Sequence, residues 1–109
     1  RRDFVQVSDV ATANVLALTA PGQVSGAYNI ASGQVCTIVE TAEAVASALR
    51  VDAPTPLVTG EYRIGDVRHV TASPELARAT FGFQAAVPFR TGLAEFARAP
   101  MRASLRPRT

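Results

Sequence analysis

The chain has 109 residues, of which 48% are hydrophobic and 18% charged, with a formal net charge of +2, a composition typical of one globular domain. No apolar run approaches the roughly 18 residues of a membrane-spanning helix, and a single cysteine, Cys36, excludes an internal disulfide, so we expect a soluble cytoplasmic protein. All eleven basic residues are arginines, which excludes Schiff-base chemistry and lysine-dependent phosphate loops.

The chain opens on a predicted strand and a predicted helix. Residues 4–7 are rich in β-prone side chains, and because almost no sequence precedes them we expect a fragment or an excised domain. Ser8 or Asp9 can cap a helix over residues 10–20. This segment is apolar nearly all round, so the helix should be buried on most sides.

Two short extended segments and a second helix follow. Residues 27–30 and 34–36 are β-prone, and since two such strands do not make a stable sheet, we expect the first to join a larger parallel sheet. Thr37 and Glu40 have the spacing of a capping box, and apolar side chains over residues 38–50 fall on one stripe. The pattern predicts an amphipathic helix that packs its apolar face against the protein.

The second half is predicted to contain long loops and two helices. Residues 51–59 carry two prolines and are typical of a loop, whereas residues 69–72 can be extended. A serine, a proline and an acid at 73–75 start a short helix that Gly82 stops. Apolar residues at helical spacing between 89 and 96 predict a closing helix.

The last ten residues, 100–109, belong to a basic segment that contains no acid. Its arginines, counted from the last acid of the chain, are Arg98, Arg102, Arg106 and Arg108. Such a segment can bind nucleic acid, but prolines interrupt it and no aromatic side chain is interleaved for base stacking. We therefore expect one domain over residues 1–99, a flexible basic tail, and no nucleic-acid partner.

Several kinds of site are excluded by residues that the chain lacks. No Gly-x-Gly-x-x-Gly motif occurs among the seven glycines, which excludes a dinucleotide-binding loop. His69 and Cys36 have no companions at ligand spacing, so we expect no metal site. No serine lies in a nucleophile elbow, which argues against a Ser-His-acid triad.

The segment 60–68, Gly-Glu-Tyr-Arg-Ile-Gly-Asp-Val-Arg, is the candidate site. The guanidinium of Arg63 can make two parallel hydrogen bonds to a phosphate, and Arg2 offers a second guanidinium. Asp66 can accept hydrogen bonds from a pair of sugar hydroxyls, and Gly65 allows a ligand to approach the backbone closely. Loop arginines are more often solvated or paired with an acid than bound to a ligand, so these residues alone favour the solvated or paired interpretation.

Four motifs occur in order along residues 1–99. They are Arg-Asp-Phe-Val-Gln-Val-Ser-Asp-Val-Ala at 2–11, Tyr-Asn-Ile-Ala-Ser-Gly at 28–33, Arg-Ile-Gly-Asp-Val-Arg-His at 63–69, and Phe-Gly-Phe at 81–83 followed by Gly-Leu at 92–93. This order resembles the C-terminal part of extended short-chain dehydrogenases/reductases, the NAD-dependent epimerases and dehydratases of nucleotide sugars. The resemblance implies an α/β fold, with this chain as its substrate-binding part, made mainly of helices with a few short strands.

The resemblance also implies roles for individual residues. Arg2 and Arg63 are expected to contact the substrate diphosphate, and Asp66 to hold the nucleoside ribose. Asp3 and Asp9 are expected only to cap or brace turns.

The family's hydride chemistry depends on residues that this chain does not have. The resemblance implies NAD bound by a Gly-x-x-Gly-x-x-Gly loop, and a Tyr-x-x-x-Lys pair in which the tyrosine is the base and the lysine lowers its pKa. Tyr28 and Tyr62 are not followed by lysine at the fourth position. Two further departures are Gln6, where the family usually has histidine, and Ser73, where aspartate is common. We expect the chain to be inactive alone.

Two functions remain open from the sequence, beside a truncated gene with no function, which would show as an aggregating chain. The first is the part of an NAD-dependent epimerase or dehydratase that binds a UDP- or dTDP-sugar, completed by a missing N-terminal dinucleotide-binding half and compatible with a homodimer. The second is a non-enzymatic anion-binding or interaction module that uses its arginine-rich tail. Loss of nucleotide-sugar binding in Arg63→Ala favours the first, and tail-dependent nucleic-acid binding favours the second.

Overall fold

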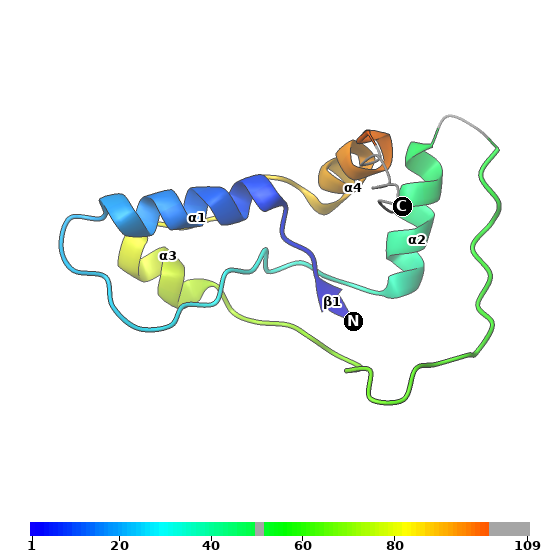
Figure 1. Ribbon diagram of the computed structural model, residues 1–109, viewed down its shortest axis with the longest axis horizontal. Helices are drawn as coiled ribbons and strands as arrows, with labels where there is room; N and C mark the ends of the chain where they lie inside the picture. The colour runs from blue at the N-terminus through cyan, green and yellow to red at the C-terminus, as the bar shows by residue number, and fades with distance from the viewer. Residues whose placement is uncertain (50–51, 101–109) are drawn as a thin grey trace, which may run out of the picture.

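A computed structural model describes residues 1–49 and 52–100 (Figure 1). Its elements are, in chain order, β1 (Arg2–Asp3), α1 (Val7–Thr19), β2 (Val35–Cys36), α2 (Ile38–Ala48), α3 (Glu75–Phe81) and α4 (Phe89–Arg98). The described part of the chain is therefore mostly helical, with two short antiparallel strands. No helix in these two ranges is long and apolar enough to cross a membrane. The predicted basic tail lies, from residue 101 onward, outside the described residues.

β1 lies between two neighbouring segments of backbone. On one side it pairs antiparallel with β2, so that Arg2 lies opposite Cys36. On the other side Arg2 forms an isolated parallel bridge with Val70, in which the Val70 N–H donates to the Arg1 carbonyl at 3.0 Å and the Asp3 N–H donates to the Val70 carbonyl at 3.2 Å. The backbone of Arg2 is thus held from both edges, as in the middle strand of a sheet.

The strand predicted over residues 4–7 is wrong. The strand pairing falls on Arg2–Asp3, and Val7 already belongs to α1. The N-cap is Gln6, whose side-chain oxygen accepts a hydrogen bond from the Ser8 N–H at 3.0 Å. Glutamine is not among the preferred capping residues, so the sequence favoured a start two or three residues later.

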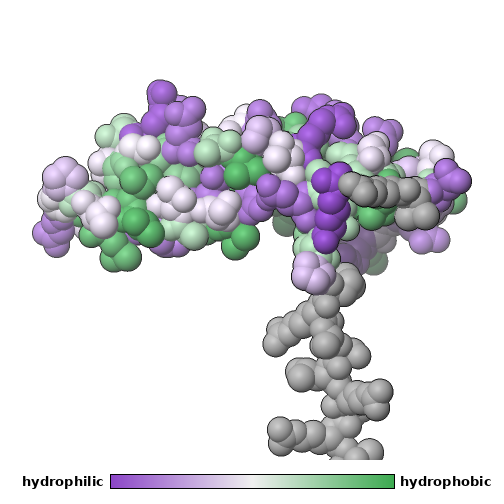
Figure 2. All heavy atoms as spheres, turned by 90° about the horizontal axis from the view of Figure 1, so that it is seen from above, coloured by the Kyte–Doolittle hydropathy of each residue, from purple (hydrophilic) through white to green (hydrophobic). Residues whose placement is uncertain are grey.

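α1 is buried along one side and exposed along the other. Its buried residues are Asp9 and Ala13, whereas the side chains of Val15 and Leu18 are 57% and 86% exposed. Figure 2 shows green apolar surface at the end of the molecule where α1 lies. The predicted burial on most sides is therefore wrong for the part of the chain that the structure describes, because no element there covers this face of α1.

Residues 27–30 do not form the predicted strand. A strand needs a hydrogen-bonded neighbour, and the paired backbone of the described residues is confined to β1, β2 and Val70. Tyr28 and Ile30 instead pack, partly buried, against the core. The Tyr28 ring meets the Phe81 ring edge-on, with 5.2 Å between ring centroids.

The core lies where α1, α3 and the segment after α3 meet. Phe83 is fully buried there beside Ala13 and Ala77, and within residues 1–49 and 52–100 it is the only large side chain that is fully buried. The other buried apolar side chains in these ranges are those of Ala31 and Ala44. Because alanine contributes little apolar area, this core is small, and much of the large apolar surface stays exposed.

α2 begins as predicted. The Thr37 hydroxyl accepts a hydrogen bond from the Glu40 N–H at 3.1 Å, and the Glu40 carboxylate accepts one from the Thr37 N–H at 2.7 Å, which confirms the capping box. The hydrogen bond from the Thr37 N–H, followed by one that the Thr37 hydroxyl donates to the Glu40 carboxylate at 2.9 Å, holds the pKa of Glu40 below its ordinary value. α2 packs against α4, as Figure 1 shows.

α3 begins one residue later than predicted, at Glu75 with Pro74 as its N-cap, whereas its end at Gly82 is as predicted. The Ser73 hydroxyl accepts a hydrogen bond from the Glu75 N–H at 3.3 Å at the start of α3. Gly82 ends that helix with φ of 73°, a left-handed conformation that suits glycine, and its N–H donates to the Arg78 carbonyl at 2.9 Å. α4 follows Pro88 directly.

Candidate functional site

Two of the three predicted site residues meet in the structure. Nη2 of Arg2 lies 3.2 Å from Oδ1 of Asp66, 64 residues further along the chain. The side chain of Arg2 is 24% exposed and that of Asp66 is 59% exposed, so the pair lies at the surface within reach of a ligand. The bridge between β1 and Val70 explains the meeting, because it brings the end of the Asp66 loop beside Arg2.

The guanidinium of Arg2 is fixed by further hydrogen bonds. Its Nη1 donates to the carbonyl of Arg1 at 3.0 Å and to that of Arg68 at 3.3 Å. Together with the bond to Asp66, these contacts engage both Nη1 hydrogens and one Nη2 hydrogen. Within the described residues, the single hydrogen on Nε and the second hydrogen on Nη2 have no hydrogen-bond partner. Such donors suit a phosphate oxygen.

A tight turn relates Arg63 to Asp66. The Asp66 N–H donates to the Arg63 carbonyl at 3.1 Å, and Gly65 inside the turn has φ of 86°. Residues with a Cβ rarely adopt this conformation, and no atom lies within 4 Å of the place a Cβ would occupy, so the backbone at Gly65 is open to a ligand. The loop belongs to the connection between α2 and α3, which Figure 1 shows in green outside the helices.

Arg63 stands apart from the other two site residues. Its side chain is exposed and forms no ion pair or hydrogen bond with residues 1–49 or 52–100. The structure therefore brings Arg2 and Asp66 together and leaves Arg63 on the same turn, facing solvent.

The surroundings of the Arg2–Asp66 pair are electropositive. His69 is exposed, and its pKa is lowered by desolvation first and then by neighbouring positive charges, among them that of Arg68. The ring is therefore neutral near pH 7, and the positive charge of this surface comes from arginines. A surface of this sign attracts an anion.

Asp3 ties β1 to the turn that precedes β2. Its Oδ1 accepts hydrogen bonds from the Ser32 N–H at 2.9 Å and the Ser32 hydroxyl at 2.6 Å. Its Oδ2 accepts one from the Gly33 N–H at 2.9 Å. The prediction that Asp3 braces a turn is confirmed.

Asp9, on α1, braces the backbone segment just before α4. The residue is only 5% exposed, and its carboxylate accepts hydrogen bonds from the Ala86 N–H at 3.1 Å and the Val87 N–H at 3.0 Å. The prediction for Asp9 is confirmed as well. Because these partners lie just before α4, Asp9 fixes the approach of that helix to α1.

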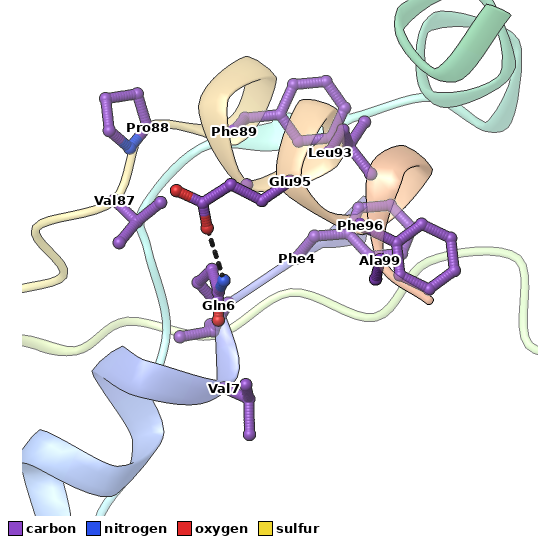
Figure 3. A pocket seen from close by; sticks show the side chains of 12 residues that line it. Phe4, Gln6, Val7, Val87, Pro88, Phe89, Leu93, Glu95, Phe96 and Ala99 are labelled. Carbon is purple, nitrogen blue, oxygen red and sulfur yellow. Dashed lines mark hydrogen bonds between the residues drawn. The ribbon is translucent and has the colours of Figure 1, made fainter. Parts of the chain in front are cut away.

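An apolar pocket of about 410 Å³ lies between the segment before α1 and α4 (Figure 3). It is lined by Phe4, Val5, Gln6, Val7, Val87, Pro88, Phe89, Gly92, Leu93, Glu95, Phe96 and Ala99. The ring centroids of Phe4 and Phe89 lie 6.1 Å apart. Nε2 of Gln6 donates a hydrogen bond to Oε2 of Glu95 at 2.9 Å. From the sequence, Phe83 and residues 87–89 were the candidates to shape a sugar pocket; residues 87–89 line this one, whereas Phe83 is buried in the core.

Gly92, a glycine inside the closing helix, is a further sequence signal for this pocket. A Cβ at Gly92 would lie 3.2 Å from Cγ of Gln6 and 3.6 Å from Cγ1 of Val87. The glycine therefore lets α4 approach the segment before α1. Gln6, where the resemblance leads one to expect histidine, both caps α1 and bonds Glu95 at the rim of this pocket.

The described residues offer no obvious metal site. Among them, no group of three or more histidine, cysteine, aspartate or glutamate side chains could hold an ion. Cys36 is half-buried, and desolvation, followed by the charges of Glu40 and Asp3, raises its pKa. The thiol is thus protonated at neutral pH and a poor nucleophile.

No protein-family model matches the chain. No solved structure matches it significantly either. The chain is 34% identical over 94 residues to dTDP-L-rhamnose 4-epimerase from Burkholderia thailandensis, a match that covers 86% of this chain and 25% of that protein. The chain thus spans about a quarter of the length of this curated relative, and over that region it is related to a nucleotide-sugar epimerase.

Proposed function

We propose that residues 1–99 are the substrate-binding part of an NAD-dependent nucleotide-sugar epimerase or dehydratase, placed in its C-terminal half. The observation that carries the proposal is the ion pair between Arg2 and Asp66, which joins two motifs far apart in the sequence at 3.2 Å. The relation to a nucleotide-sugar epimerase supports the same class of substrate.

In this proposal the Arg2–Asp66 pair forms the floor of the nucleotide site. The free donors of Arg2 hold the substrate diphosphate, and Arg63, which faces solvent on the neighbouring turn, closes on the same phosphates. Asp66 uses Oδ1 for Arg2, so Oδ2 is the oxygen that accepts a pentose hydroxyl. Two arginines on one diphosphate give a contact that depends on charge and weakens as ionic strength rises.

The nucleotide is proposed from the related protein. That protein is a dTDP-L-rhamnose 4-epimerase, so dTDP-L-rhamnose is the first ligand to try. UDP-glucose is the comparison, because it keeps the diphosphate and changes the base, the pentose and the sugar.

The hydride chemistry is proposed to lie outside this chain. No lysine and no Gly-x-Gly-x-x-Gly loop occurs among its 109 residues, so its side chains do not fit NAD. We place the cofactor in a dinucleotide-binding half, which the exposed apolar face of α1 would help to receive. Binding and orientation of the nucleotide sugar are then the contribution of residues 1–99.

Isothermal titration of the natural full-length protein with dTDP-L-rhamnose tests the proposal. Charged hydrogen bonds contribute enough that Arg63→Ala should raise the dissociation constant by about tenfold or more. Arg78→Ala is the matched control, because Arg78 is also exposed and pairs with Glu75 at 2.8 Å, on a helix away from the site. Equal affinity in the two variants would refute the role of Arg63.

A second arm separates the proposal from the interaction-module alternative. Removing the residues after Arg98 should leave dTDP-L-rhamnose affinity unchanged, since the proposed contacts come from Arg2, Arg63 and Asp66. Nucleic-acid binding that is lost with this deletion, in a protein that does not respond to nucleotide sugars, would instead establish the alternative.

A further inference from the structure

β1 carries a basic and an acidic residue side by side, and they serve opposite faces of the strand. Successive side chains of a strand point to opposite faces. Arg2 accordingly reaches the Asp66 loop, while Asp3 reaches the turn at Ser32 and Gly33. The rotation of this two-residue strand about its axis therefore decides where the Arg2 guanidinium points.

From this arrangement we infer that Asp3 is a positioning residue for Arg2. Its hydrogen bonds to the Ser32–Gly33 turn, called the clasp below, hold the Arg2 guanidinium toward the proposed diphosphate site at Arg2 and Asp66, called the anion site below. The inference rests on the proposed function, because it concerns the same Arg2. It adds a residue for which the sequence predicted only a bracing role.

The clasp is built from a carboxylate and converging donors. Asp3 accepts three hydrogen bonds, from the Ser32 N–H, the Ser32 hydroxyl and the Gly33 N–H, at 2.9, 2.6 and 2.9 Å. Consecutive backbone N–H groups that converge in this way form a concave binding place for an anionic group. Gly33 supports it with φ of 78°, which a residue with a Cβ rarely adopts.

The clasp also reaches the neighbouring strand. The Ser32 hydroxyl that donates to Asp3 accepts a hydrogen bond from the Gln34 N–H at 3.0 Å. Gln34 leads directly into β2, whose Val35 pairs with Asp3. Side chain and backbone of Asp3 thus hold the same turn at both of its ends.

The other edge of β1 connects Asp3 to the anion site. The Asp3 N–H donates to the carbonyl of Val70 at 3.2 Å, and Val70 lies two residues after Arg68 in the sequence. The Arg68 carbonyl in turn accepts from Nη1 of Arg2. A rotation of β1 would therefore break the backbone bond at Val70 and displace Arg2 from Arg68 and Asp66 together.

Asp3→Asn keeps the size of the side chain but turns an acceptor into an NH₂ group that faces an N–H of the clasp. In the natural full-length protein titrated with dTDP, we expect this change to weaken binding by about tenfold. Because Asp3 acts through Arg2, the double variant Arg2→Ala/Asp3→Asn should bind no more weakly than Arg2→Ala alone. Additive losses, or unchanged affinity in Asp3→Asn, would overturn the inference.

Asp9→Asn is the matched control. Its carboxylate also accepts two backbone hydrogen bonds, from Ala86 and Val87, but it anchors α1 and not β1. It should lower the unfolding midpoint as Asp3→Asn does, and any loss of dTDP affinity should add to that of Arg2→Ala. Coupling of Asp9→Asn to Arg2→Ala as strong as that of Asp3→Asn would show a merely structural effect and refute the special role of Asp3.

A ligand-free measurement separates this inference from the proposed function. If the unaltered protein fails to bind dTDP, the proposed function fails, and the Nε signal of Arg2 in ¹⁵N NMR still reports its ordering. We expect fast side-chain motion of Arg2 to increase in Asp3→Asn and to stay unchanged in Asp9→Asn. Equal order of the Arg2 side chain in all three proteins would contradict the clasp.

Discussion

The ion pair between Arg2 and Asp66 is exposed, and exposed pairs contribute little to folding stability because water screens them. The Arg2 side chain is nevertheless oriented by several partners, since it also donates to two carbonyls. A pair that is well oriented but adds little stability is what a binding site needs. This difference gives a test at the level of single side chains.

Asp66→Asn removes the charge and keeps the shape. We expect the free energy of unfolding to change by less than about 1 kcal/mol, because the pair is solvent-exposed. Affinity for a nucleoside diphosphate should nonetheless fall, because Arg2 loses its anchor and the pentose loses a charged acceptor. Urea unfolding and calorimetric titration of the same samples measure both. A large loss of stability with unchanged affinity would mean that Asp66 is a structural residue.

The roles of Asp3 and Asp9 as turn braces could be predicted, but their partners could not. The residue type indicates that a carboxylate will accept backbone N–H groups. The donors, however, lie 29 and 30 residues away for Asp3 and 77 and 78 residues away for Asp9. Only the fold decides such distant pairings. The same holds for Arg2 and Asp66, which were both predicted site residues but not predicted to bind one another.

Among the helices, α2 shows what local sequence can decide. Its capping box connects residues three positions apart, so the pattern of the chain was enough to locate it. The start of α1 and the strands expected over residues 4–7 and 27–30 were predicted wrongly, whereas β2 falls inside the extended segment expected at 34–36. Gln6 is an unusual cap, and the residues that pair in strands are set by neighbours distant in sequence, such as Val70 beside Arg2.

Thr37→Ala tests the cap of α2. Loss of the hydroxyl leaves the Glu40 N–H without its acceptor and should reduce the free energy of unfolding by about 1 kcal/mol. Thr12→Ala is the control, because Thr12 lies inside α1 with its hydroxyl bonded to the Ser8 carbonyl, and alanine is the better helix former there. Urea unfolding should show a loss for Thr37→Ala and none for Thr12→Ala. The reverse order would contradict the capping role.

The charge of Glu40 makes the same cap dependent on pH. Hydrogen bonds from Thr37 lower the pKa of this carboxyl in the folded state below its ordinary 4.5, so its ionised form stabilises the fold. That contribution is present above pH 4.5 and is lost as the pH falls through the folded-state pKa. The stability difference between the unaltered protein and Glu40→Gln should therefore shrink on acidification. A difference that stays constant down to pH 3 would show that the carboxylate charge is irrelevant.

For the molecule as a whole, apolar surface is the main observation. The core contains one large buried side chain among the described residues, Phe83, while Val15 and Leu18 on α1 lie exposed. The sequence could not say which apolar faces the chain leaves uncovered. We interpret the face of α1 as the place where the proposed dinucleotide-binding half packs.

Leu18→Asp tests this interpretation in the natural full-length protein. If another part of the protein covers α1, a buried aspartate there should cost about 2 kcal/mol or more of unfolding free energy. Leu57→Asp is the control, since the Leu18 and Leu57 side chains are 86% and 85% exposed here, but Leu57 lies on the connection between α2 and α3. Equal stability of the two variants would mean that the face of α1 stays in contact with water.

A crystal structure of the natural full-length protein with dTDP bound would test the proposed function most directly. We predict phosphate oxygens within hydrogen-bonding distance of the guanidinium groups of Arg2 and Arg63, and a pentose hydroxyl on the Asp66 carboxylate. Nucleotide bound in the apolar pocket between Phe4 and α4, with the Arg2–Asp66 pair in contact with water alone, would contradict it.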